Sequence, residues 1–349
     1  MTERNSAPLV VRFGSLGDMV LLTGLLNTLH RRFGRPCDLL SGTTWPMALL
    51  DGHPDLGQVY RIASRSRPYW TDPEQWRLVR WLRNRPPGPV FVCDDLRRNK
   101  LARLLRRAGI DPANCVYFSE AELSARRHWF DRLADMAQRV PQRFADAGLP
   151  TVAAPDHPLL PVSGAARADL ARWRAENRLD GPLVLIQPGN KRTQRRGGLN
   201  RTDHHKWWPP GRWQQVIAAV LERLPDARVI LCGAPSEQPL LLQIGALAND
   251  PRVRACGLEL PLPRLMALCE VAHSLIAVDS GPAHIAAALG CPSVVLFGAA
   301  PPWLWQPRAT KGVVVTVVGG EPEGLNRIDA IPAQTVISAW RALPGRSRT

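Results

Sequence analysis

The stretch Val10–Gly24, VVRFGSLGDMVLLTG, decides the fold of the N-terminal half. An apolar, β-branched run enters a turn containing Gly14 and Gly17, and an apolar helical segment follows and ends at Gly34. A strand, a glycine-containing turn and a helix in this order predict the first unit of an α/β fold with a parallel sheet. Such turns usually bind phosphate at the helix N-terminus. Asp18 places a carboxylate there, which would repel phosphate, so its presence needs another explanation.

Length and composition set the scale of the fold. The chain has 349 residues, 45% of them apolar, so we expect two domains of roughly 150 residues each. No run reaches the roughly 18–20 consecutive apolar residues of a membrane-spanning helix. The first residues, MTERNSAPLVVRFG, lack the pattern of a secretory signal peptide. A cytoplasmic protein is therefore expected.

Cysteine usage agrees with that compartment. The seven cysteines are scattered, most lie in or beside apolar runs, and no CxxC pair occurs. Neither a disulfide framework nor a zinc site is expected from this pattern. The prediction is reduced, buried thiols that pack as small apolar side chains.

Short apolar runs alternate with helical segments in both halves of the chain. The strands predicted in the N-terminal half are residues 8–14, 37–42, 58–63, 89–95 and 114–119, with helices over 19–34, 76–84 and 99–109. The strands predicted in the C-terminal half are residues 182–189, 227–235, 274–281 and 292–298, with helices over 211–225, 236–250, 262–273, 282–290 and 333–343. This alternation predicts two doubly wound parallel sheets.

A proline-rich stretch, residues 148–164, separates the two halves and leads into a short predicted helix, residues 166–179. We therefore expect Rossmann-like domains over residues 1–155 and 182–332, a linker over 156–181, and a C-terminal helix and tail over 333–349. Ligands of such folds bind at the carboxyl ends of the strands. The expected site is a cleft between the two domains that faces the carboxyl ends of both sheets.

The formal net charge of +15 indicates an anionic partner. Basic residues cluster in RLVRWLRNR (77–85), DDLRRNKLARLLRRAG (94–109) and NKRTQRRGGLNR (190–201). Nucleic acid, an anionic membrane surface and a multiply charged small substrate all fit such a field, and charge alone does not choose among them. Arginine used only for solubility is the alternative for each cluster.

The segment SLIAVDSGPAHIAAALG, residues 274–290, carries the sharpest site prediction. An apolar strand ends at Asp279, and Ser280, Gly281 and a proline then start a helix. Free N–H groups and the positive end of the helix dipole at the strand's carboxyl end predict a diphosphate site. His284, in the first helical turn, can donate to a phosphate oxygen. The alternative is that Asp279 only caps the helix and His284 is a half-buried neighbour.

A second segment follows the strand that ends at Gly189. A long basic loop leads to KWWPPGRW, residues 206–213, in which Lys206 is held beside a tryptophan and prolines and can neutralise a diphosphate. Most arginines of the loop also fit a solvated surface. The run TDHHK, residues 202–206, lacks metal-ligand spacing, so no metal is expected.

Other nucleotide fingerprints are absent from the sequence. FGSLGD is not G-x-G-x-x-G, and nothing matches G-x-x-x-x-G-K-[ST], so dehydrogenase and P-loop functions are disfavoured. Asp94 and Asp95 lie at a strand end; a metal-binding pair is one interpretation, and surface caps are the favoured one.

Three motifs in order resemble the lipopolysaccharide heptosyltransferases, glycosyltransferase family 9, over nearly the full chain. They are RFGSLGDMVLLTGLLNTL (12–29), KWWPPGRWQQVI (206–217) and VDSGPAHIAAALGCPSVVLFG (278–298). The resemblance implies a GT-B fold with an N-terminal acceptor domain and a C-terminal nucleotide-sugar domain. It also implies inverting, metal-independent transfer of heptose from ADP-heptose to the inner core of lipopolysaccharide, without a cofactor.

The resemblance also implies roles for individual residues. Asp18 is the general base, and Ser15 and Gly17 lie with it in the acceptor site; Lys206 contacts the leaving diphosphate. The donor site is formed by Gly189, Lys206, Asp279, Ser280, Gly281 and His284. The loop before Lys206 is longer and more basic than in the family. The basic N-terminal helices suit an anionic acceptor or the inner face of the cytoplasmic membrane.

Two alternatives stay open at this point. One is a GT-B glycosyltransferase with another nucleotide-sugar donor or a protein acceptor. The other is a basic, non-catalytic nucleic-acid-binding protein, which no RNA- or DNA-reading motif in the sequence supports. If Asp18 is the base, it faces Asp279 and Gly281 across open space and does not point into the core.

Overall fold

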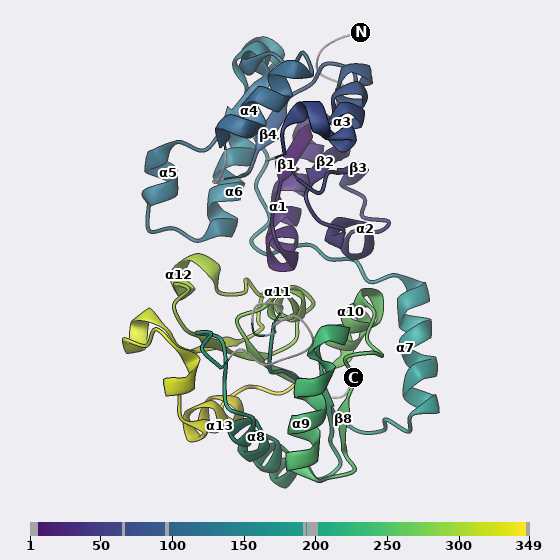
Figure 1. Ribbon diagram of the computed structural model, residues 1–349, viewed down its shortest axis with the longest axis vertical. Helices are drawn as coiled ribbons and strands as arrows, with labels where there is room; N and C mark the ends of the chain where they lie inside the picture. Colours follow the sequence, from purple (N-terminus) through teal and green to yellow (C-terminus); the bar gives the residue numbers. More distant parts are fainter. Residues whose placement is uncertain (1–5, 65–66, 95–97, 191–192, 194–201, 347–349) are drawn as a thin grey trace. The chain divides into compact units, whose positions relative to one another are not determined.

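The computed structural model describes residues 6–64, 67–94, 98–190, 193 and 202–346 (Figure 1). Contacts divide the chain into two compact units, residues 1–161 (unit 1) and 162–349 (unit 2). Each unit contains one sheet in which neighbouring strands run parallel. The prediction of two parallel-sheet α/β domains is therefore confirmed.

Unit 1 has a five-stranded sheet in the order β3-β2-β1-β4-β5. Its central strand, β1, is fully buried and pairs on both sides, so Leu9 lies opposite both Asp38 and Val90. Helices α3 and α4 pack on one face of the sheet through apolar side chains, and α1 packs against α6. The strands are β1 (Leu9–Arg12), β2 (Cys37–Ser41), β3 (Leu56–Arg61), β4 (Val90–Val92) and β5 (Cys115–Tyr117); the helices are α1 (Leu16–Phe33), α2 (Trp45–Leu49), η2 (Tyr69–Thr71), α3 (Pro73–Asn84), α4 (Arg98–Arg107), η3 (Pro112–Asn114), α5 (Glu120–Ser124), α6 (Trp129–Gln138) and η4 (Gln142–Ala147).

Unit 2 has a six-stranded sheet in the order β11-β10-β9-β6-β7-β8. Helices α8, α9 and α13 cover one face and share a core with the strands, whereas α7, α10 and α11 contact one another in series. The strands are β6 (Leu183–Gln187), β7 (Arg228–Leu231), β8 (Val253–Ala255), β9 (Ser274–Val278), β10 (Ser293–Phe297) and β11 (Val315–Gly319); the helices are α7 (Gly164–Glu176), α8 (Pro210–Arg223), η5 (Pro235–Glu237), α9 (Gln238–Ala248), α10 (Leu262–Val271), α11 (Gly281–Ala288), α12 (Pro302–Trp305), η6 (Glu321–Glu323), η7 (Ile328–Ala330) and α13 (Ala333–Arg341).

Every predicted strand exists, and the helix predicted to end at Gly34 does so, because that glycine adopts the left-handed conformation that closes a helix (φ 69°). Two strands were not predicted, β8 and β11. Both are edge strands of the sheet of unit 2. Strand β8 is only three residues long and half-buried, so its sequence carries little alternation.

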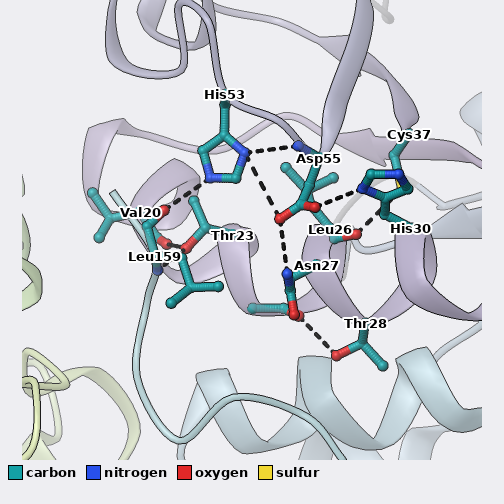
Figure 2. Close-up of polar contacts among 11 residues, drawn as sticks. Val20, Thr23, Leu26, Asn27, Thr28, His30, Cys37, His53, Asp55 and Leu159 are labelled. Atoms are coloured by element: carbon teal, nitrogen blue, oxygen red, sulfur yellow. Dashed lines mark hydrogen bonds and ion pairs between the residues drawn. The ribbon is translucent and has the colours of Figure 1, made fainter. Parts of the chain in front are cut away.

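The segment before the boundary between the units is fastened to unit 1 (Figure 2). The backbone N–H of Leu159 donates to Thr23 Oγ1 at 2.9 Å, and the carbonyl of Leu159 lies 2.9 Å from His53 Nε2. Because His53 Nδ1 accepts the N–H of Asp55, its Nε2–H is the donor to Leu159. The following helix, α7, contacts α10. It therefore belongs to unit 2, although the sequence analysis included it in the linker.

The described helices include none that is both long and apolar enough to cross a bilayer. All seven cysteines are free thiols, and six of them are buried. Burial raises the pKa of Cys93 to about 12, so these side chains act as small apolar groups, as predicted.

Candidate active site

The turn between β1 and α1 holds Asp18 in place. Asp18 lies in the first turn of α1, where its Oδ2 accepts the backbone N–H of Ser15 at 2.6 Å and the Ser15 hydroxyl at 2.8 Å. The carboxylate thus caps the helix N-terminus and faces the positive end of its dipole. A Cβ on Gly14 would lie 2.4 Å from Asp18 Cβ, so glycine is required there for the carboxylate to occupy this position. Ser15 is therefore hydrogen-bonded to Asp18, and Gly17 is buried inside α1.

A buried arginine supports Asp18 from the strand side. Arg12 Nη2 donates to Asp18 Oδ1, and Arg12 Nη1 donates to the carbonyl of Cys93 at 2.6 Å and lies 3.8 Å from Asp94 Oδ1. The guanidinium stacks over the Trp129 ring, 4.6 Å from its centroid. One cation is therefore shared between two carboxylates, both largely removed from solvent.

The sequence analysis missed this arrangement. Arg12 stands at the end of a buried apolar strand, and an arginine there needs a buried partner, which was the available signal. The interpretation of Asp94 as a surface cap is wrong, because Asp94 is buried and accepts the backbone N–H of Phe13 at 2.9 Å. Its neighbour Asp95 lies outside the described residues.

Opposing influences set the pKa of Asp18. Burial raises it, but the charge of Arg12 and the hydrogen bonds from Arg12 and Ser15 together outweigh burial, so the pKa is lowered below its ordinary value. Asp18 is therefore ionised at neutral pH. Three of the roughly four lone-pair directions of its oxygens are used by Arg12 and Ser15, which leaves room for one further donor.

The second group of predicted residues gathers at the carboxyl ends of β6 and β9, which are neighbours in the sheet of unit 2. Lys206 Nζ donates to Asp279 Oδ2 at 2.5 Å and to the backbone carbonyl of Asp279 at 3.1 Å. The amide of Asn190, on the loop after β6, approaches the same carbonyl at 3.4 Å. The loop that carries Lys206 is thereby tied to the end of β9, and the ammonium group is held at the entry to α11.

Helix α11 opens directly beyond this ion pair. Ser280 is its N-cap residue in an extended conformation, and Pro282 is in the first turn. The Ser280 hydroxyl is buried and does not cap the helix; it has no hydrogen-bond partner among the described residues. His284 is buried in the first turn. The N-terminal N–H groups of the helix and the Ser280 hydroxyl are thus donors suited to an anion.

Gly189 follows β6 and lies next to Glu237. A Cβ there would lie 2.7 Å from Glu237 Oε1 and 3.0 Å from Thr193 Oγ1, so glycine allows the loop to pack against η5, the short helix that follows β7. Glu237 is buried and accepts the backbone N–H of Ala234 at 2.8 Å. Burial raises its pKa, opposed by that one hydrogen bond. The sequence analysis did not single out Glu237, because a lone glutamate after a strand has no distinguishing pattern.

The remaining site predictions concern metal and the basic loop. In the described ranges no cluster of three histidine, cysteine, aspartate or glutamate side chains could hold a metal ion. Residues 191, 192 and 194–201, which supply most of the basic loop, lie outside the described residues.

Comparison with known proteins agrees with this architecture. The chain is 36% identical over 104 residues to Lipopolysaccharide heptosyltransferase 3 of Escherichia coli (29% of this chain, 30% of the relative). It is 30% identical over 149 residues to the protein of the same name from strain K12 (40% and 42%). The matches therefore span less than half the length of these curated relatives.

Solved structures match over nearly the whole chain. The structure of E. coli ADP-heptose lps heptosyltransferase II has a TM-score of 0.71 at 20% identity, covering 96% of this chain and 98% of that one. E. coli heptosyltransferase WaaC with ADP has a TM-score of 0.66 at 18% identity, covering 96% and 99%. These similarities define the fold as GT-B, the class of glycosyltransferases built from two Rossmann-like domains.

The family follows from a more specific match. The model of glycosyltransferase family 9 (heptosyltransferase) matches residues 129–326, more than half of the chain. The chain belongs to this family, and the predicted fold and family are confirmed.

Proposed function

We propose that the protein is an inverting, metal-independent glycosyltransferase that moves heptose from ADP-heptose to the inner core of lipopolysaccharide. Family membership supports transfer of a heptose. The names of the relatives support ADP-heptose as donor and lipopolysaccharide as acceptor, and the WaaC structure was obtained with ADP.

One observation carries the donor half of the proposal, namely the position of Lys206 beside Asp279 at the start of α11. A departing nucleoside diphosphate needs compensation of its growing negative charge. In our proposal Lys206 and the N–H groups from Gly281 onward provide it, and Ser280 and His284 donate to phosphate oxygens. Asp279 holds the ammonium group in place, and Gly189 lets the loop after β6 approach the nucleotide.

The acceptor half of the proposal rests on Asp18. In an inverting displacement the acceptor hydroxyl attacks the anomeric carbon of the donor, the bond from that carbon to the diphosphate oxygen breaks, and the hydroxyl proton must leave. Ionised Asp18 takes this proton through its remaining lone-pair direction. A carboxylate with a lowered pKa is a weak base, so it accepts the proton late, when the attacking oxygen has become acidic. Ser15 and Gly17 shape the backbone beside the acceptor.

The acceptor proposed here is anionic and lipid-anchored, so the enzyme works at the inner face of the cytoplasmic membrane. Contact with that surface supplies a reason for the basic composition of the N-terminal half. Catalysis also needs Asp18, in unit 1, to reach the sugar held by unit 2 during the reaction.

A donor panel tests the proposal. The purified protein is incubated with a heptose-deficient lipopolysaccharide acceptor and ADP-heptose, UDP-sugars or GDP-sugars in turn, with excess EDTA. Release of nucleoside diphosphate and the mass of the acceptor are measured. We expect acceptor-dependent release of ADP from ADP-heptose, with the acceptor gaining one heptose. Turnover of a UDP- or GDP-sugar instead, or complete loss of activity in EDTA, would contradict the proposal.

A further inference from the structure

We propose that one exposed face of unit 1 is a docking surface for an anionic lipid bilayer. This surface, called here the α3–α4 surface, consists of Trp70, Trp76, Arg77, Arg80, Arg106 and Arg107. The inference rests on the proposed function only in that a lipid-anchored acceptor gives the enzyme a reason to sit at a membrane. Its evidence is the chemistry of the surface itself.

The aromatic part of the surface is exposed in an unusual way. The side chain of Trp70 is 75% exposed and that of Trp76 is 46% exposed. The two indoles belong to one cluster, because Trp76 Nε1 donates to the carbonyl of Tyr69 at 2.7 Å and the rings of Tyr69 and Trp70 lie 5.6 Å apart. Exposed indoles grouped in this way are typical of proteins that insert side chains at the membrane–water interface, where the ring is buried and its N–H stays hydrated.

Arginines surround these rings. The Arg107 guanidinium lies over Tyr69, 4.5 Å from the ring centroid, and 5.5 Å from that of Trp70. Arg83 Nη2 donates to the carbonyl of Arg107 at 2.8 Å, which joins the C-terminal ends of α3 and α4. Trp76 and Arg80 are four residues apart on α3, so they share one face of that helix. Arg107 therefore lies against the aromatic cluster, and the helices that carry the other arginines of the surface, α3 and α4, are in contact with each other (Figure 1).

The cations on this surface are not neutralised. In the described part of the chain no carboxylate forms an ion pair with Arg77, Arg80 or Arg106. Helix α4 contains no acidic residue, and the two acids at the start of α3 are occupied locally, where Asp72 caps the helix and Glu74 accepts the N–H of Ala63.

Unit 2 shows that this is not how the chain uses arginine everywhere. Several arginines there are bridged to carboxylates, as in Arg167 with Glu270 at 2.7 Å, Arg264 with Asp169 at 2.7 Å and Arg252 with Asp250 at 2.6 Å. Solubility alone does not explain why a group of arginines without ion pairs lies next to two exposed tryptophans. Anionic headgroups supply the missing negative charge, and the interfacial layer accepts the indoles.

The test is flotation of the full-length protein with vesicles of phosphatidylcholine alone or mixed with phosphatidylglycerol. Two double variants probe the two components, Arg77→Glu/Arg80→Glu and Trp70→Ala/Trp76→Ala. The control is Arg223→Glu/Lys311→Glu, which makes the same change in net charge at exposed positions of unit 2. Circular dichroism and thermal melting confirm that each variant is folded.

We expect the wild type and the control to bind mixed vesicles and to bind phosphatidylcholine weakly. The arginine variant loses at least about fivefold in partition coefficient for each charge removed. The tryptophan variant loses binding that persists at high salt, where the arginine contribution is screened. An equal loss of vesicle binding in the control and in the arginine variant would show that only net charge matters, and it would overturn the proposal. Binding of the protein to an oligonucleotide but not to mixed vesicles would also overturn it.

Activity separates this inference from the proposed function. With a water-soluble, delipidated acceptor and no vesicles, the variants of the α3–α4 surface are expected to transfer heptose at the wild-type rate. Vesicle binding without heptose transfer would contradict the proposed function but not the docking surface. Heptose transfer without vesicle binding would contradict the docking surface but not the proposed function.

Discussion

The carboxyl edges of the two sheets handle charge in opposite ways. In unit 1 the cation is buried and permanent, because Arg12 binds Asp18 and approaches Asp94 under the ring of Trp129. In unit 2 the cation is a lysine with one carboxylate partner, Asp279, beside the free N-terminus of a helix. The first arrangement keeps the Asp18 carboxylate ionised and fixed in orientation. The second keeps a positively charged site, Lys206 and the helix N-terminus, that can also bind an anion.

This difference separates proton chemistry from anion binding. A fixed guanidinium prevents Asp18 from acquiring a proton from solvent, so its remaining lone-pair direction is reserved for an incoming donor. Lysine is a flexible point charge, and it can turn from Asp279 to a phosphate without leaving its loop. Substitutions in unit 1 should therefore change the rate of transfer, and substitutions in unit 2 should change the affinity for the nucleotide.

The largest expected effect comes from Asp18→Asn. Asparagine keeps the size of the side chain and an oxygen for the N–H of Ser15, but it cannot take a proton. We expect transfer to fall about 10²–10⁴-fold while the dissociation constant for ADP, measured by calorimetry, changes less than about twofold.

Asp94→Asn is the matched control, since it removes the other carboxylate beside Arg12 and leaves the base intact. If both variants lose transfer equally and in proportion to stability, Asp18 has a structural role only. Transfer by Asp18→Asn within a few-fold of the wild type would remove it as the base.

The next effect concerns stability and pH together. Arg12→Gln leaves two buried carboxylates without their cation, and breaking such a pair costs about 3–5 kcal/mol of unfolding free energy. Because the pKa of Asp18 is lowered in the folded protein, its stabilising contribution is complete above the unfolded value near 3.8 and is lost as the pH falls through the folded value. The stability difference between wild type and variant should therefore be largest near neutral pH and shrink on acidification.

The matched readout is the pH profile of transfer. Without Arg12, burial raises the pKa of Asp18 and only the hydrogen bonds from Ser15 oppose it, so the acidic limb of the profile should move to higher pH. Arg12→Lys keeps the positive charge and should shift the acidic limb less. This variant replaces Arg12→Gln in the experiment if Arg12→Gln does not fold. An unmoved limb in both variants would show that Arg12 does not control the ionisation of the base.

The sequence predicted much of this edge structure for physical reasons. Apolar runs bounded by glycines gave the strands and the helix ending at Gly34, because local backbone preferences decide these features. The helix start at Ser280 was predicted on the same grounds. Local rules also placed Asp279 directly after a buried strand and Asp18 in the turn that follows one, at the edge where parallel sheets expose side chains.

Contacts between distant segments could not be predicted in the same way. Arg12 and Asp94 are 82 positions apart, and Asp279 and Lys206 are 73 apart, so only the strand order β1-β4 or β6-β9 brings them together. Glu237 was missed for the same reason, since it lies next to Gly189, 48 positions earlier in the chain. The periodicity of a segment predicts which of its faces is buried, but it does not identify the residues against which that face packs.

A smaller effect is expected in unit 2, from Lys206→Gln. Loss of one charge-assisted contact to the diphosphate should raise the dissociation constant for ADP about 10–100-fold. AMP, which lacks the second phosphate, should lose less. The comparison of ADP with AMP separates direct contact from mere support of Asp279, because a structural role predicts equal losses for both. Arg223→Gln, an exposed position on α8, is the control and should leave both affinities unchanged.

The smallest effect concerns Glu237, the buried acid of unit 2 that forms no ion pair among the described residues. Burial raises its pKa in the folded state, so its protonated form stabilises the protein below the unfolded value near 4.5, and that stabilisation is lost as the pH rises through the folded value. Glutamine is neutral at every pH and can still accept the N–H of Ala234. Glu237→Gln should therefore raise the unfolding free energy at pH 8 and change it little near pH 4. Glu222→Gln, at an exposed position, should show no such trend in urea titrations. Destabilisation of Glu237→Gln at pH 8 would mean that the ionised form of Glu237 stabilises unit 2, which would contradict the raised pKa.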